Sequence, residues 1–237
     1  MDIGKAFSFV FEDEKWVSKV LLGGVLFFIP IVNLAVFGYM LKVAQNVAQG
    51  NPRPLPEWGE FGEHFIRGLH WLAIQIVYQL PTIILYALFF CVIVAAGGAA
   101  DSQRGGNGAG AIGALGLCLL PLIFILALFG AFLAYVAAGR YVVTNSLSEA
   151  FKFREVIAGA RGNLGAWLMV LLVVILAGFA GSLGVIACGV GVLFTSFYAQ
   201  CVIGHALGQT VGQLGMLGGA TEPPAPPPSY GPPPTYQ

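Results

Sequence analysis

The sequence predicts an all-α integral membrane protein with about six membrane segments. This prediction rests on the amino-acid composition and on the long stretches that lack charge. Of the 237 residues, 57% are apolar and 9% are charged, and the mean hydropathy is +0.82. Soluble domains carry about 25% charged residues, so these few charges could not cover a water-exposed surface. Four stretches lack charge, 20–41, 68–100, 105–139 and 162–221. A helix needs roughly 20 apolar residues to cross a bilayer.

The balance of charges and the cysteines exclude several classes of protein. Basic and acidic residues number 11 each, so no basic excess is present to attract nucleic acid, and lipid is the expected partner. The cysteines lie inside apolar runs and show no CxxC or CxH spacing, which indicates small buried side chains rather than disulfides or zinc ligands. These are Cys91, Cys118, Cys188 and Cys201.

The N-terminal segment and the first apolar stretch decide the expected topology. Asp2 and Glu12 to Glu14 are unlike the basic leader of a cleavable signal peptide, so the first apolar segment is expected to remain in the mature chain. Residues 16–49 have a helical sequence pattern, but Pro30 interrupts it because proline cannot continue a regular helix. They form either one kinked, tilted span or a short helical hairpin that enters and leaves the bilayer on one side.

Counting basic residues favours the hairpin. A kinked span divides the 11 basic residues into four and seven, with most of them outside, whereas a hairpin leaves only Arg104 away from the other ten. Positive charge marks the cytoplasmic side, so both termini are expected in the cytoplasm. Each arm has about 15 residues, or about 22 Å of helix, which allows a re-entrant hairpin.

The remaining elements follow along the chain. Single spans are expected at 68–100 and 105–139, and glycines near 181–191 divide the last stretch into helices at 164–186 and 190–212. Three amphipathic segments are expected to lie in the cytoplasmic membrane surface. Their apolar residues are Ile3, Phe7, Val10 and Phe11, then Trp58, Phe61, Phe65 and Leu69, then Phe153, Val156, Ile157 and Ala160.

A weak internal repeat suggests duplication. The segment at 6–9 (AFSF) matches 150–153 (AFKF), and 39–50 (YMLKVAQNVAQG) resembles 198–209 (YAQCVIGHALGQ). Each pair flanks a helical hairpin, as in the parallel repeats of membrane transport folds. Chance similarity between apolar segments is the alternative.

The order of these features resembles a prokaryotic membrane family, the domain of unknown function numbered four-zero-one-three. The segments that carry the resemblance are GYMLKVAQNVAQGNPRPLPEW at 38–58, FGEHFIRGL at 61–69 and EAFKFREV at 149–156. The resemblance covers roughly residues 1–212, and its most specific residues are Gly38, Tyr39, 55–58 (LPEW) and Gly68. The resemblance implies a multi-pass membrane fold, but it implies no activity and no functional residue.

Polar residues within the apolar stretches are the candidates for a site. A polar cleft between the second and last spans is one interpretation, and hydrogen bonding between helices is the other. The residues concerned are Gln75, Gln79, Ser196, Gln200, His205 and Gln209. Gly204, Gly208 and Gly212 recur every four residues, which lets another helix approach closely. His70 and His205 are expected to form interfacial hydrogen bonds.

The sequence indicates no catalytic, cofactor or metal site, and we therefore expect no enzyme. No charge occurs at the centre of a proposed span, which argues against a charge-coupled pump. Ser182 and His205 would differ in depth by about 13 Å, whereas a nucleophile and its base need roughly 3 Å. The glycine-rich loop at 97–110 lacks the phosphate-binding pattern GxxxxGK[ST].

The C-terminal residues 219–237 are expected to be a disordered, proline-rich tail after a membrane domain at 1–218. The tail carries two PPxY patterns, which aromatic grooves of WW-type domains bind. Their residues are Pro227, Pro228 and Tyr230, then Pro233, Pro234 and Tyr236.

Together these features predict a non-enzymatic scaffold or accessory protein of the cytoplasmic membrane, with lipid and a tail-bound protein as partners and homo-oligomerisation allowed. The alternative is a channel or transporter for a small neutral or lipidic substrate. A water-filled cavity lined by the polar residues would support that alternative.

Overall fold

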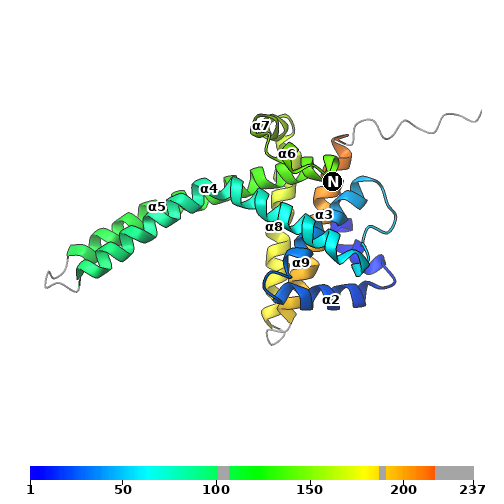
Figure 1. Ribbon diagram of the computed structural model, residues 1–237, viewed down its shortest axis with the longest axis horizontal. Coiled ribbons are helices and arrows are strands. Elements are labelled where there is room, and N and C mark those ends of the chain that lie inside the picture. The colour runs from blue at the N-terminus through cyan, green and yellow to red at the C-terminus, as the bar shows by residue number, and fades with distance from the viewer. Residues whose placement is uncertain (101–106, 187–190, 217–237) are drawn as a thin grey trace, which may run out of the picture.

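The computed structural model describes residues 1–100, 107–186 and 191–216, and within these ranges the chain is helical and contains no strand (Figure 1). The helices are α1 (Ile3–Ser8), η1 (Phe9–Glu12), α2 (Trp16–Phe28), α3 (Leu34–Ala48), η2 (Trp58–Glu60), α4 (Phe61–Ala100), α5 (Asn107–Thr144), α6 (Leu147–Ala150), α7 (Phe153–Gly162), α8 (Leu164–Ser182), η3 (Leu183–Ile186) and α9 (Gly191–Gln213). The all-helical prediction is confirmed for these residues.

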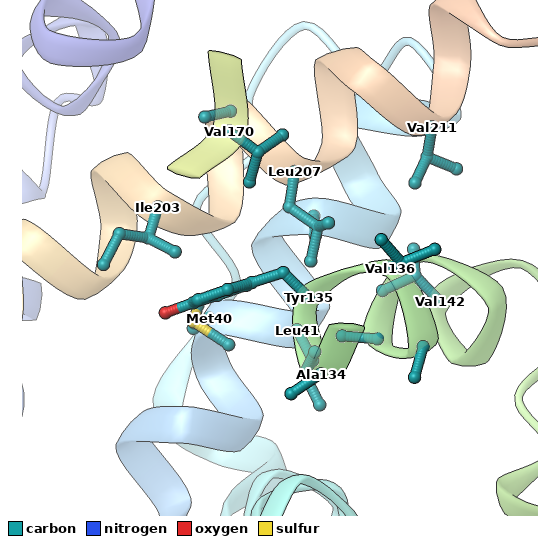
Figure 2. Packing of buried hydrophobic residues seen from close by; sticks show 14 of the residues in the cluster. Met40, Leu41, Ala134, Tyr135, Val136, Val142, Val170, Ile203, Leu207 and Val211 are labelled. Carbon is teal, nitrogen blue, oxygen red and sulfur yellow. The ribbon is translucent and has the colours of Figure 1, made fainter. Parts of the chain in front are cut away.

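The centre of the molecule is the contact between α3 and α9. A Cβ atom at Gly204 or Gly208 of α9 would overlap the carbonyl oxygens of Met40 and Ala44 on α3, so the two backbones lie in direct contact. Around this pair, side chains of α3, α5, α8 and α9 converge on one core, with Leu207 and Tyr135 among them (Figure 2). α9 is thereby enclosed by other helices along most of its length.

Residues 16–49 form two helices, α2 and α3. The chain breaks at residues 29–33, where Pro30 is followed by Ile31 at a φ of 72°. The two helices contact each other little: α2 packs mainly against α9, and α3 packs against α4 and α9. One continuous kinked helix is therefore excluded, and the two arms diverge rather than lie side by side (Figure 1).

α4 and α5 form a long arm that projects from the rest of the molecule (Figure 1). α4 has 40 residues and α5 has 38, which corresponds to about 60 Å of helix, twice the roughly 30 Å of a bilayer core. The first half of α4 packs against α3. The outer half exposes large apolar side chains such as Leu88, Phe90 and Phe124, each at least 57% exposed.

The expected surface helix near residues 58–69 is not a separate element. It is continuous with the span that follows, and it turns His64 and Arg67 inward while Phe61 and Leu69 are exposed. The reason is the crossing with α3, which requires Gly68 and its neighbours on the inner face. The other two amphipathic segments form α1 with η1, and α7.

Among the described residues, three helical segments are long and apolar enough to cross a membrane: Trp58–Ala95, Leu119–Thr144 and Leu164–Val185. α8 and α9 begin within one residue of the predicted positions. However, α9 is not among the three segments, since Gln200, His205 and Gln209 lower its hydropathy, and its enclosed position explains how it accommodates them.

Candidate functional site

The polar residues of α4 and α9 do not meet in the structure. The Gln79 amide nitrogen donates to the Ala127 carbonyl of α5 at 3.1 Å, and Gln75 is half-buried on the same helix. α4 packs chiefly against α3 and α5, whereas α9 packs chiefly against α3 and α8. Ser196 and Gln200 are half-buried on α9. The described residues therefore contain no cleft that joins the two polar sets.

His205 and Gln209 instead face the N-terminus. The Asp2 amide donates to Gln209 Oε1 at 2.7 Å, and Gln209 Nε2 donates both to the Asp2 carbonyl at 3.1 Å and to His205 Nδ1 at 3.1 Å. The His205 ring packs on Phe9, with ring centroids 4.3 Å apart. The last helix is thus joined to the first residues of the chain.

A cleft of about 390 Å³ lies beside these contacts. Its lining includes Asp2, Lys5, Phe9, Glu12, His205 and Gln209. Sequence reasoning identified the two residues of α9 but missed those of the N-terminal segment, because 207 positions separate Asp2 from Gln209. No short motif connects residues at that separation.

The two other residues considered for chemistry have structural partners. The Ser182 hydroxyl donates to the Phe179 carbonyl of its own helix at 2.7 Å. His70 Nδ1 lies 2.8 Å from the Tyr141 hydroxyl, which joins α4 to α5. Within residues 1–100, 107–186 and 191–216, no three His, Cys, Asp or Glu side chains come together to hold a metal ion.

The segment 55–58 (LPEW) is held by a second cluster. The Tyr39 hydroxyl donates to the Pro56 carbonyl at 2.9 Å, and the Tyr39 ring stacks on Trp58 with centroids 4.6 Å apart. The indole nitrogen of Trp58 donates to the Lys19 carbonyl at 3.2 Å. His64 Nε2 lies 3.1 Å from the Glu57 carbonyl. The cluster therefore fixes the loop after α3 against α2, α3 and α4.

Lys19 is the buried charge in this cluster. Its ammonium lies 2.8 Å from Asp13 and 3.2 Å from Glu57, and donates to the Leu55 carbonyl at 3.1 Å. Burial alone would raise the pKa of the Asp13 carboxyl, but the hydrogen bonds from Lys19 and from the Lys15 amide outweigh it and lower that pKa below 3.8. The Asp13 carboxyl is therefore ionised at neutral pH.

Glycines bring α3 and α4 into backbone contact beside this cluster. A Cβ at Gly38 would overlap the His64 carbonyl, and one at Gly68 would overlap the Leu34 carbonyl. Gly38, Tyr39, 55–58 and Gly68 are the most specific residues of the family resemblance. The two glycines lie at this crossing, and Tyr39 holds the adjoining loop through Pro56 and Trp58. Their shared role in the fold is to join helices.

These observations define, for the part of the chain that the structure describes, an all-helical protein with three helices long and apolar enough to cross a bilayer. The chain belongs to the family described as protein of unknown function (DUF4013), whose model matches residues 22–190. This confirms the resemblance over a shorter range than 1–212. No curated protein and no solved structure matches the chain.

The remaining sequence candidates divide between the described and undescribed parts of the chain. Gly204, Gly208 and Gly212 all lie against α3 within the same chain. Cys91 is exposed and Cys201 is buried, both as free thiols. Cys188 and the tail residues from Pro227 to Tyr236 lie outside the described residues, as does the side chain of Cys118.

Proposed function

We propose that the chain is a non-enzymatic, multi-pass protein of the cytoplasmic membrane that acts as a scaffold or accessory protein. The apolar surface of the α4–α5 arm is the main observation that supports this proposal. The outer half of the arm exposes many large apolar side chains on both helices, among them Leu88, Phe90 and Phe124, and water would not stabilise so large an apolar surface. Lipid is the solvent that suits it, because both helices satisfy their backbone hydrogen bonds internally.

The proposed topology places both termini in the cytoplasm with six membrane segments, α2 and α3 forming a short pair that enters and leaves on one side. Contacts between distant segments support it. Arg53 pairs with Glu14 at 2.8 Å, and Gln45 donates to Asn145 at 3.3 Å. Asp2 bonds to Gln209 near the end of α9. Segments in direct contact share one side of the membrane.

We also propose that the chain contains a duplication. Each proposed half begins with short helices, α1 with η1 or α6 with α7, and continues with two helices, α2 with α3 or α8 with α9. The order of the helices supports the proposal, although α8 and α9 pack along each other and α2 and α3 diverge. Tyr39 and Tyr198 are equivalent in the repeat, and each donates its hydroxyl to a backbone carbonyl. An experimental structure in which residues 1–49 and 147–213 fail to superpose would refute this proposal.

The transporter alternative gains no support from the described residues. Gln79 is bonded to α5, and His205 and Gln209 are bonded to the N-terminus. A pathway lined by both sets would require α3 and α9 to separate, although their backbones are in contact. The scaffold interpretation needs no such rearrangement.

A pull-down from native membranes tests the scaffold role. The full chain and a chain ending at Gly219 are compared, each with a tag at the N-terminus. The proposal expects specific protein partners with the full chain and their loss on truncation, because the PPxY patterns lie beyond residue 219. An identical set of proteins from both chains, or none from either, would contradict a docking tail.

A further inference from the structure

The cleft beside His205 gathers charges that lack ion-pair partners among the described residues. Most other described charges are paired, as in Asp13 with Lys19 or Glu14 with Arg53. Asp2, Lys5 and Glu12 form no salt bridge, and all three line this one cleft. Its volume of about 390 Å³ lies within the range of small-molecule sites, roughly 300–1,000 Å³.

The hydrogen bonds around Gln209 fix the tautomer of His205. Gln209 Oε1 accepts from the Asp2 amide, so its Nε2 is the donor toward His205 Nδ1. Nδ1 must then carry the lone pair, and Nε2 carries the proton. His205 is only 4% exposed, and its Nε2 has no partner in the described part of the chain. A buried ring that lines the cleft thus carries an N–H group without a partner among the described residues.

The C-terminal ends of two helices add negative electrostatic potential in the cleft. α3 ends at Ala48 and α9 ends at Gln213, and Val47, Gly50 and Gln213 line the cleft. The C-terminal end of a helix carries partial negative charge and favours a cation. With the carboxylates of Asp2 and Glu12, these ends favour a cationic group, whereas Lys5 and the His205 N–H favour an anionic acceptor. The cleft therefore suits a ligand that carries both a cationic group and an anionic group.

We propose that this cleft binds a phosphoethanolamine group, with its ammonium between Glu12 and Asp2 and its phosphate at Lys5 and His205 Nε2–H. A primary ammonium a few bonds from a phosphate matches the opposite charges of the lining. The group occurs both as a lipid headgroup and in soluble phosphodiesters. The lipid form rests on the proposed membrane location, where α1 lies at the surface.

Native mass spectrometry of the full, detergent-solubilised protein tests the site. The probes are phosphatidylethanolamine, phosphatidylglycerol, which lacks the ammonium, and phosphatidylcholine, whose methylated ammonium has no N–H. Phosphatidylethanolamine is expected to bind most tightly. Soluble glycerophosphoethanolamine is added as a competitor: effective competition identifies a soluble ligand, and no competition identifies the lipid. Either result supports the site.

Exposed residues provide variants that leave the fold intact. Glu12→Gln and Lys5→Gln are each expected to weaken the binding of the preferred probe about fivefold, the effect of one partly screened ion pair. Glu14→Gln and Lys15→Gln are matched controls, because these side chains do not line the cleft. They are expected to change the Kd less than twofold.

Equal binding of the three lipids would overturn the proposal. Unchanged binding in both Glu12→Gln and Lys5→Gln would also overturn it. Neither outcome bears on the scaffold role, which the tail truncation tests separately.

Discussion

At the scale of single residues, the family signature is explained by backbone contacts that only glycine allows. Gly38 and Gly68 lie where α3 and α4 cross, each against a carbonyl oxygen of the other helix. A backbone carbonyl cannot turn aside as a flexible side chain can, so an added methyl group must move a whole helix. Overpacking of this kind costs about 1–3 kcal/mol or more.

Gly38→Ala is therefore expected to lower the free energy of unfolding by about 3 kcal/mol. Gly62→Ala on α4 is the control, because a Cβ there meets no atom within 4 Å and alanine favours a helix. Thermal unfolding in detergent, followed by loss of the monodisperse peak in gel filtration, measures both. Equal midpoints for the two variants would show that α3 and α4 do not cross at Gly38.

The pair of Asp13 and Lys19 makes stability depend on pH at the acidic end. The pKa of Asp13 is lowered in the folded chain, so its contribution is fully present above about pH 4 and is lost as the pH falls through the folded value. Asp13→Asn is expected to be less stable at pH 7, since Lys19 loses a partner inside the protein. Its stability should also fall less steeply below pH 4.

Glu14→Gln is the matched variant for this test, since Glu14 is exposed and pairs with the exposed Arg53. Unfolding midpoints measured from pH 7 to pH 3 compare the three proteins. If Asp13→Asn and Glu14→Gln show the same dependence on pH, the buried pair is not formed.

The sequence predicted the residues of the candidate site less completely than it predicted the helices. It singled out His205 and Gln209 as polar residues in an apolar helix, but not Asp2, Lys5 or Glu12 beside them. Hydrogen bonds between residues 207 positions apart depend on the complete fold. The intrahelical spacing of Gln75 and Gln79 likewise gave no information on which neighbouring helix they would face.

At the scale of elements, the α4–α5 arm is the feature that most requires a membrane. Leu88 is 60% exposed and Phe90 is 57% exposed, far from the core formed by α3, α5, α8 and α9. The arm is apolar around its whole circumference, which is typical of helices solvated by lipid. Its outer half, from Pro81 to Ala100, has about the length of one crossing.

Leu88→Arg is accordingly expected to impair membrane insertion, because an arginine at the centre of a span costs roughly 2.5–3.5 kcal/mol. Glu60→Arg, in η2 just before α4, is the control and should insert normally. The fraction of protein that resists extraction by alkaline carbonate measures insertion. Equal resistance of both variants would show that position 88 is not within lipid.

The helices were well predicted where apolar residues are continuous, and poorly where charges occur inside the fold. α8 and α9 begin within one residue of their predicted positions. Arg67, by contrast, lies opposite the apolar residues of its segment in sequence, which is typical of a solvated face, yet it is buried and bonded to Glu63, which also pairs with Lys42. A charged residue does not reveal from the sequence alone that its partner is inside the protein.

At the scale of the whole molecule, almost all charges lie in a few segments of the chain that alternate with long uncharged stretches. Between residues 68 and 139 only Asp101 and Arg104 are charged, and after residue 161 only Glu222 is. The N-terminal segment, the loop after α3 and the segment after α5 are joined by hydrogen bonds and ion pairs. The proposed topology places these segments on one side of a bilayer.

Labelling of single cysteines in intact cells tests this arrangement most directly. The four native cysteines are replaced, and one cysteine is placed at Lys5, at Lys152 or at Gly105 in the loop between α4 and α5. A membrane-impermeant maleimide is expected to label only position 105 in intact cells and all three positions after lysis. Labelling of position 152 in intact cells while position 5 stays protected would contradict the account.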